Sequence, residues 1–187
     1  MKKYIGTSLR TTLVLSLLLC VIYPVAVMFV GKLAKGGGDG EQIVVNGKVI
    51  GYANVGQSFT KPQYFWGRPS AVGYNAAGSG GSNKGPSNPD YLKDVQKRVD
   101  TLLKYHPYLK AADIPSDMVT ASGSGLDPDI SPEAAKMQIK RVALYRHLNE
   151  QKVAALVDSH TEKPLLGIFG PEKVNVLKLN VALDQLK

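Results

Sequence analysis

The segment with the clearest potential for chemistry is a glycine-rich run, because such runs often bind phosphate groups. Residues 78–83 read Gly-Ser-Gly-Gly-Ser-Asn. A P-loop requires Gly-x-x-x-x-Gly-Lys followed by Ser or Thr, and a dinucleotide-binding loop requires Gly-x-Gly-x-x-Gly between a strand and a helix. The chain contains no P-loop pattern, and no Gly-x-Gly-x-x-Gly lies between a predicted strand and a predicted helix. The run therefore predicts a flexible or tightly turning loop rather than a phosphate site.

A second candidate is the acidic segment that begins at Asp127. Asp127 and Asp129 have the spacing of the first two ligands of a calcium-binding loop. Pro132, however, stands where that loop needs glycine, and Gln138 stands where it needs a bidentate acid. Helix capping and turn formation explain these residues better, so the sequence predicts no metal site.

The histidines and the single cysteine do not indicate catalysis either. His106, His147 and His160 lie far apart, without the spacing of a metal-binding motif or a marked nucleophile beside them. Cys20 is the only cysteine, which excludes an internal disulfide and a site built from several thiolates. We therefore expect no hydrolase chemistry.

The remaining conspicuous motif is Phe65-Trp66-Gly67-Arg68-Pro69. Trp and Arg are enriched among the residues that dominate protein–protein binding. The segment either packs on its own core or presents aromatic and guanidinium groups to a partner. The sequence leaves both alternatives open.

These groups follow an apolar stretch, Thr11–Gly31, whose 21 residues carry no charge and include 12 of Leu, Ile, Val or Phe. A helix of this length spans about 31 Å, close to the hydrocarbon thickness of a bilayer. A cleaved signal peptide would have a shorter apolar core and a small-x-small cleavage site, and the residues after Val30 offer no convincing one. The stretch therefore predicts a retained transmembrane helix.

The charges that flank this stretch predict its orientation. Three basic residues and no acid precede it, whereas the bases that follow, Lys32 and Lys35, are accompanied by two acids. Excess Lys and Arg favour the cytoplasmic side. We expect a basic cytoplasmic tail (residues 1–10), the transmembrane helix (11–31), a glycine-rich hinge (32–42) and a soluble extracytoplasmic domain (43–187).

Composition limits the partners of that domain. The chain has a net charge of +8, with 23 basic and 15 acidic residues. The amino-terminal tail holds three of the bases, so the rest carries 20 bases and 15 acids, or about +5. No run of bases occurs in it, which argues against nucleic acid as a partner. With 44% apolar residues, the chain can build one ordinary core.

Local patterns predict an α+β domain with long Gly/Pro-rich loops. Asn46-Gly47 between two β-branched runs predicts a hairpin of residues 43–45 and 48–50, with strand character continuing to about Gln57. The elements expected after it are a loop (58–87), a helix capped by Asn88 that ends at Pro107, a short strand (117–121), a loop (122–130), a helix capped by Ser131, a short helix from Asn149 to Val157 and a carboxyl-terminal helix (175–186).

Together these segments resemble the C subunit of the Kdp potassium-transporting P-type ATPase. Each block alone is weak, but their order and spacing over almost the whole chain are specific. Departures from the usual pattern at Tyr52, Asn54, Lys84 and Asp129 argue against a strict role for position 129 or for the strand before Gln57. The blocks are Tyr23-Pro24, Gly56 to Phe59, Tyr64 to Ala71, Ser79 to Asn83, Val119 to Ser122, Gly125 to Asp127, Ile130 to Ala135, Arg141 to Ala143, Val174 to Leu177 and Leu179-Asn180.

The resemblance implies a non-catalytic, single-span accessory subunit of a bacterial high-affinity potassium pump in the inner membrane. Its implied partners are a channel-like potassium-binding subunit, a P-type subunit that hydrolyses ATP, and a very small single-span subunit. The chain lacks the Asp-Lys-Thr-Gly phosphorylation motif. The family is described as a catalytic chaperone that raises the ATP affinity of the hydrolysing subunit. This implies an ATP contact shared with that subunit, to which we link Gln57, and no tightly bound cofactor.

The predicted orientation conflicts with a direct ATP contact, because ATP is cytoplasmic and the domain is expected outside. We therefore favour a domain that caps the external mouth of the potassium-binding subunit, with the helix packed among that subunit's helices. The alternative is a free-standing, membrane-tethered extracytoplasmic binding module. The candidates for partner contact are Tyr23, Pro24, Phe65, Arg68, Ser82, Asn83 and Asp127.

Overall fold

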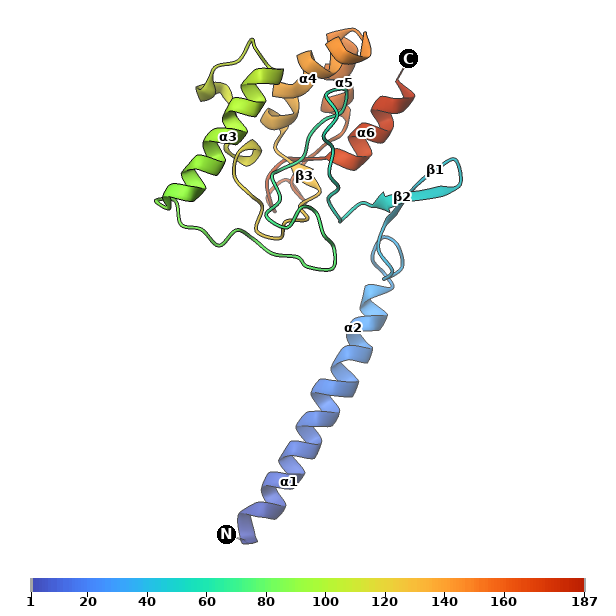
Figure 1. Ribbon diagram of the computed structural model, residues 1–187. Helices are drawn as coiled ribbons and strands as arrows, with labels where there is room; N and C mark the ends of the chain where they lie inside the picture. The colour runs from blue at the N-terminus through green and yellow to red at the C-terminus, as the bar shows by residue number, and fades with distance from the viewer. Residues whose placement is uncertain (1, 187) are drawn as a thin grey trace. The chain divides into compact units, whose positions relative to one another are not determined.

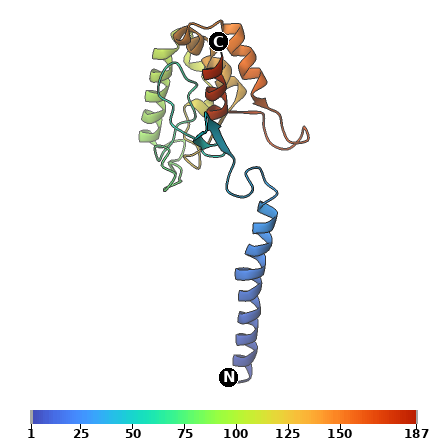
Figure 2. The ribbon, with the colours of Figure 1, turned by 90° about the vertical axis from the view of Figure 1, so that its right-hand side faces the viewer.

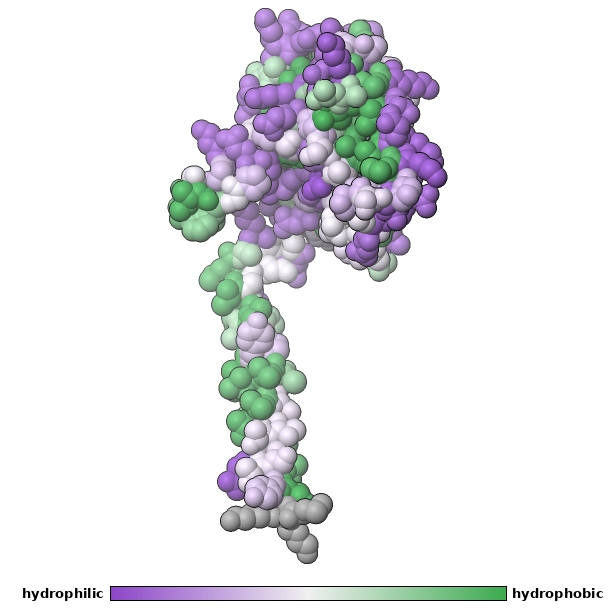
Figure 3. Space-filling view, turned by 90° about the vertical axis from the view of Figure 1, so that its left-hand side faces the viewer, coloured by the Kyte–Doolittle hydropathy of each residue, from purple (hydrophilic) through white to green (hydrophobic). Residues whose placement is uncertain are grey.

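The computed structural model describes residues 2–186, and the chain divides into two compact units, one ending at Gln42 and one beginning at Ile43. The first unit is dominated by a long helix made of α1 (Lys2–Leu17), the π-helical turn η1 (Leu18–Ile22) and α2 (Tyr23–Gly31) (Figures 1 and 2). From Tyr4 to Gly31 it is long and apolar enough to cross a membrane. Figure 3 shows hydrophobic side chains along much of its length. The predicted apolar helix is confirmed, and helical structure also includes residues 2–10.

Pro24 explains the π-helical turn. Proline has no N–H, and in a regular helix its ring collides with the carbonyl four residues earlier, here that of Cys20. The Tyr23 N–H donates to the carbonyl of Leu18, five residues back, which widens the turn just before the ring. The effect of Pro24 on this helix is therefore a π-helical turn rather than a break.

The second unit begins with the predicted hairpin, formed by β1 (Gln42–Val45) and β2 (Lys48–Tyr52). Asn46 and Gly47 have φ angles of 50° and 75°, as a two-residue type I′ turn requires. The expected continuation of the strand to Gln57 is wrong, because β2 ends at Tyr52 in a turn. Residues 58–87 form neither helix nor strand, as predicted.

Within residues 43–186, four α-helices form most of the domain. Each begins after an Asn or Ser whose side-chain oxygen accepts backbone N–H bonds of the first turn, which otherwise lack partners. The predicted caps and the carboxyl-terminal helix are confirmed. The helices and their caps are α3 (Pro89–Tyr105, Asn88), α4 (Pro132–Arg146, Ser131), α5 (Glu150–Ser159, Asn149) and α6 (Val176–Gln185, Asn175).

A second, three-stranded antiparallel sheet has the order β3-β5-β4. The strands are β3 (Asp129–Ile130), β4 (Thr161–Glu162) and β5 (Lys173–Asn175). Val174 in the central strand lies opposite Ile130 on one side and Thr161 on the other. These strands are too short to show an alternating pattern in the sequence, and sequence analysis did not predict them.

The strand predicted for residues 117–121 is wrong. Pro115 leads into a 3-10 turn, η3 (Ser116–Met118), which follows a similar turn, η2 (Ala111–Asp113). The carbonyl of Ser116 accepts hydrogen bonds from the N–H and the hydroxyl of Thr120, at 2.9 and 2.7 Å. These local bonds use groups that a strand would need for pairing.

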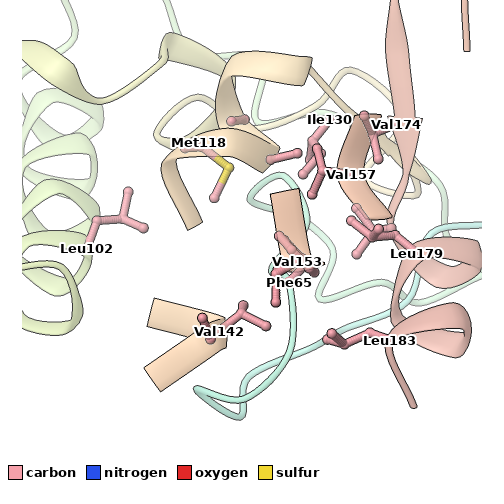
Figure 4. Close-up of a cluster of buried hydrophobic side chains, with 14 residues drawn as sticks. Phe65, Leu102, Met118, Ile130, Val142, Val153, Val157, Val174, Leu179 and Leu183 are labelled. Carbon is pink, nitrogen blue, oxygen red and sulfur yellow. The ribbon is translucent and has the colours of Figure 1, made fainter. Parts of the chain in front are cut away.

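The hydrophobic core lies between the helices and the three-stranded sheet, and the loop residue Phe65 is at its centre (Figure 4). Helices α4 and α5 pack together, and α6 contacts α5 and β5. On α3 only Leu102 is fully buried, whereas Leu92 is 52% exposed. The labelled core residues are Phe65, Leu102, Met118, Ile130, Val142, Val153, Val157, Val174, Leu179 and Leu183.

Candidate functional site

Two buried amide side chains hold the loop that carries Phe65 and Trp66. Asn180 in α6 accepts a hydrogen bond from the Phe65 N–H and donates one to the Phe65 carbonyl, both at 2.9 Å. Gln138 in α4 bonds Trp66 in the same way, at 2.7 and 3.1 Å. Each amide supplies one donor and one acceptor, as a neighbouring strand would. An irregular loop is therefore fixed in place without strand pairing.

Arg141 in α4 is 1% exposed and lies against this loop. Its guanidinium carbon is 4.1 Å from the centroid of the Trp66 ring, within the range of a cation–π contact. The guanidinium donates to the carbonyls of Pro62 and Tyr64 and, at 2.6 Å, to Oε1 of Gln138. The buried guanidinium of Arg141 thus connects the loop that carries Phe65 and Trp66 to α4.

His106 is the remaining partner of Arg141. Nε of Arg141 donates to Nε2 of His106 at 3.0 Å, so the proton of the neutral ring lies on Nδ1, which is 2.8 Å from the Leu102 carbonyl. Burial lowers the pKa of His106 to about 4, and the positive charge of Arg141 acts in the same direction. Burial also lowers the pKa of Arg141 to about 10, so the guanidinium stays protonated at neutral pH. Its partners among the described residues are neutral acceptors.

Arg68, from the same loop, takes part in a different contact. Its guanidinium bonds the Asp127 carboxylate at 2.9 Å, and both side chains are about a quarter exposed. The Tyr74 hydroxyl donates to the Arg68 carbonyl at 2.5 Å. Burial raises the pKa of Tyr74 to about 12, assisted by the negative charge of Asp127. The structure therefore brings together two predicted contact residues, Arg68 and Asp127, that are 59 positions apart in the chain.

This ion pair lines a cleft of about 610 Å³ beside β3 and β5. Lys173 bonds Asp129 at 2.7 Å, which raises the pKa of Lys173, and the Asp117 carboxylate accepts the Ser131 N–H at 2.8 Å. Among residues 2–186, no group of three or more His, Cys, Asp or Glu is placed to hold a metal ion. Most of the charged groups in the cleft thus already form ion pairs or hydrogen bonds within the domain. This arrangement is suited to polar contacts with a protein. Its charged lining is Arg68, Asp117, Asp127, Asp129, Glu133, Glu172 and Lys173.

The glycine-rich run 78–83 packs against the loop that precedes Asp127. Gly80 donates its N–H to the Ser124 carbonyl at 2.8 Å. Gly125 has a φ of +68°, and a Cβ there would lie 2.8 Å from the Gly80 oxygen, so only glycine fits without strain. The predicted turning loop is thus what the structure contains.

The other predicted contact residues are not gathered at this cleft. Phe65 is fully buried, so its ring belongs to the core, the first of the two alternatives for its motif. Ser82 is half-buried and lines a separate shallow cleft, next to the exposed Asn83. Tyr23 and Pro24 lie in the N-terminal helix, in the other unit of the chain.

Gln57 makes a contact within its own chain. Its Nε2 donates to the Ile50 carbonyl in β2 at 3.0 Å. A Cβ on Gly51 would lie 1.8 Å from that nitrogen, so the glycine leaves room for the bond. Gln57 therefore fastens the hairpin to the loop that follows it.

The buried polar residues Gln138, Arg141 and Asn180 were not among the predicted site residues. A signal existed for the first two in the sequence, because they share a helical face with the apolar residues Ala135 and Val142. Polar residues that share a helical face with apolar ones either have hydrogen-bond partners in the interior or show that the face was wrongly predicted to be buried. Here they are paired.

Comparison with known proteins gives a consistent result over the whole chain. Residues 5–185 match the family described as K+-transporting ATPase, c chain. A protein of Flavobacterium johnsoniae, named potassium-transporting ATPase KdpC subunit, is 62% identical over 185 residues, which cover 99% of this chain and all of the relative. Relatives of the same name from Bacteroides fragilis and Caldanaerobacter subterraneus are 54% and 45% identical, over 96% and 98% of this chain and 96% and 95% of their own.

Proposed function

Because the chain belongs to the family of c chains of K+-transporting ATPases, we propose that it is a non-catalytic subunit that helps assemble a potassium uptake pump. The match over residues 5–185 carries this proposal. The proposed partners are a channel-like potassium-binding subunit, a P-type subunit that hydrolyses ATP, and a very small single-span subunit. The full-length match argues against a free-standing binding module.

We place the domain outside the cytoplasm of a bacterial inner membrane, over the outer mouth of the potassium-binding subunit. The excess of bases before the N-terminal helix supports this orientation. The domain's net charge of about +5 does not favour capture of potassium by the overall field. Its contribution is therefore a shaped surface held beside the ion pathway.

The interior of the domain supports a structural role for the family motifs. Phe65, Trp66 and Arg141 are held by hydrogen bonds and packing inside the domain. Arg68 and Asp127, by contrast, remain partly exposed beside the cleft. We propose that the first group gives the domain its fixed shape and that the second contacts another subunit.

Gln57 distinguishes this proposal from the catalytic-chaperone role. In Gln57→Ala, the loss of one hydrogen bond is expected to cost about 1 kcal/mol and to lower the Tm of the full chain by about 2–4 °C. The KM for ATP of the assembled pump should stay within about twofold of wild type. Gln96→Ala, on the exposed face of α3, is the control. A tenfold rise in that KM at an unchanged Tm would instead assign Gln57 to nucleotide binding.

Co-purification tests membership of the complex. A tagged full-length chain, extracted in mild detergent from cells that produce the pump, should bring down the other subunits with potassium-stimulated ATPase activity. Cells that produce the same pump with an untagged chain provide the background. Isolation of the tagged chain alone, from membranes in which the pump is active, would contradict the proposal.

A further inference from the structure

Two clefts of different chemistry meet at Arg98 in α3. The first, of about 330 Å³, is lined by α3 and the loop that carries Trp66, and we call it the apolar cleft. The second, of about 550 Å³, is lined by α3 and the glycine-rich run, and we call it the basic cleft. Arg98 lines both, and the neighbouring residues Pro69 and Ser70 line one each, so the clefts adjoin. Figure 3 looks onto the side of the domain on which α3 lies in Figure 1, where hydrophobic side chains lie among hydrophilic ones.

The apolar cleft suits an aliphatic chain. The Trp66 ring in its wall is held by its Nε1–H, which donates to the Lys61 carbonyl at 2.9 Å, and by the edge of Tyr105, at a centroid distance of 5.1 Å. Among the described residues that line the cleft, none is Asp, Glu, Asn or Gln, so it offers few groups that would recognise the polar edge of a nucleobase. Its apolar and aromatic lining is Phe59, Trp66, Leu102, Tyr105 and Met118.

The basic cleft suits an anion. Three bases, Lys84, Lys97 and Arg98, and one acid, Asp94, line it. Asp94 is 3.3 Å from Lys84, in an ion pair whose side chains are 42% and 38% exposed, so the pairing is weak. Arg98 donates from Nη1 to the Val119 carbonyl at 2.8 Å, which fixes its guanidinium and leaves other N–H donors available. Within residues 2–186 the Lys97 ammonium forms no hydrogen bond or ion pair.

We propose that the two clefts together bind one anionic phospholipid. Its phosphate lies against Lys97 and Arg98 in the basic cleft, and the first part of an acyl chain lies beside Trp66 in the apolar cleft. A phospholipid carries a phosphate and an aliphatic chain a few bonds apart, which is the order in which the clefts present a cationic and an apolar lining.

The chain's own anchor keeps this ligand at hand. The helix Tyr4–Gly31 is long and apolar enough to cross a membrane, and the hinge of residues 32–42 spans at most about 40 Å when fully extended. A domain tethered this closely meets lipid headgroups at a high effective concentration. The inference goes beyond the proposed function and needs no other pump subunit, so its failure would leave the co-purification result unaffected.

Tryptophan fluorescence of the full chain in lipid nanodiscs tests the contact, because Trp66 is the only tryptophan. Lipids with bromine near the carboxyl end of their acyl chains quench a tryptophan that they touch. Brominated phosphatidylglycerol, which is anionic, should quench Trp66 about twofold or more as strongly as brominated phosphatidylcholine at the same fraction of the bilayer. Equal quenching by the two lipids, or quenching by neither, would overturn the proposal.

A pair of variants on α3 tests the basic cleft. Lys97→Gln breaks no bond within the domain and should leave the Tm unchanged. It should raise the fraction of phosphatidylglycerol needed for half-maximal quenching about fivefold, the contribution of one basic residue beside an anionic membrane. Lys104→Gln, at an exposed position two turns further along the same helix, is the matched control and should stay within about twofold of wild type. Equal shifts for the two variants would show that overall charge, and not the basic cleft, binds the lipid, and would refute the proposal.

Discussion

Arg141→Met is expected to be the most destabilising single substitution considered for this domain. The guanidinium bonds two backbone carbonyls, an amide oxygen and a histidine nitrogen, and it is 1% exposed. Its removal leaves the Pro62 and Tyr64 carbonyls and Nε2 of His106 without this donor, each at a cost of about 1–3 kcal/mol, whereas Oε1 of Gln138 keeps its bond from the Trp66 N–H. Because the structure relaxes, we expect a total loss of about 3–5 kcal/mol.

A thermal melt of the full chain in detergent, followed by circular dichroism, measures this loss. For a protein of this size the expected fall in Tm is about 6–20 °C. Arg141→Lys should recover only part of it, because an ammonium cannot reproduce the planar fork of donors. Lys136→Met, on the exposed side of the same helix, removes only a 3.7 Å surface ion pair and should cost less than about 1 kcal/mol. A Tm of Arg141→Met equal to that of the Lys136 control would contradict the role given to Arg141.

The second large effect is a loss of stability in mild acid through His106. The pKa of this buried ring is lowered to about 4 in the folded state, against about 6.5 in the unfolded chain. As pH falls below 6.5 the unfolded chain binds a proton that the folded chain does not, so stability declines until pH approaches 4. Between pH 7.5 and 5 the expected contribution is a loss of about 2 kcal/mol.

Denaturant unfolding of the full chain at several pH values, with His106→Gln beside wild type, isolates this contribution. Gln can still accept a hydrogen bond from Arg141 but does not titrate. The variant should be less stable at pH 7.5, and its further loss toward pH 5 should be smaller than that of wild type by about 2 kcal/mol. The exposed His147, replaced by Asn, serves as control and should keep the wild-type slope. Parallel curves for His106→Gln and wild type would show that His106 does not titrate as described.

Features set by neighbouring residues were predictable from the sequence. The Asn46-Gly47 turn and the caps Asn88, Ser131 and Asn149 are local, because a side chain and the backbone within three residues decide them. The apolar helix and the family were predictable for a different reason, since both depend on long stretches of sequence.

Features that depend on contacts between distant parts of the chain were not predictable from the sequence. The strands β4 and β5 have two and three residues, and each exists only because a partner from another part of the chain lies beside it. Residues 117–121 looked like a strand but form turns, because Thr120 bonds back to Ser116. The partnership of Gln138 with Trp66 spans 72 positions, and no local pattern reports it.

For the candidate contact residues, too, the local sequence does not show which are buried and which are exposed. Nothing in Phe65-Trp66-Gly67-Arg68 shows that Phe65 fills the core while Arg68 reaches Asp127. That division follows from Asn180, which fixes Phe65 from 115 positions away.

The side of the membrane on which the domain lies tests the central claim most directly. Full-length chains with a reporter fused after Lys187, and chains with the reporter fused after Gly40, should show alkaline phosphatase activity, because that enzyme folds only outside the cytoplasm. A fluorescent protein that matures only inside should stay dark at both positions. Bright fluorescence and inactive phosphatase at both positions would place the domain with ATP in the cytoplasm and contradict a cap on the ion-entry side.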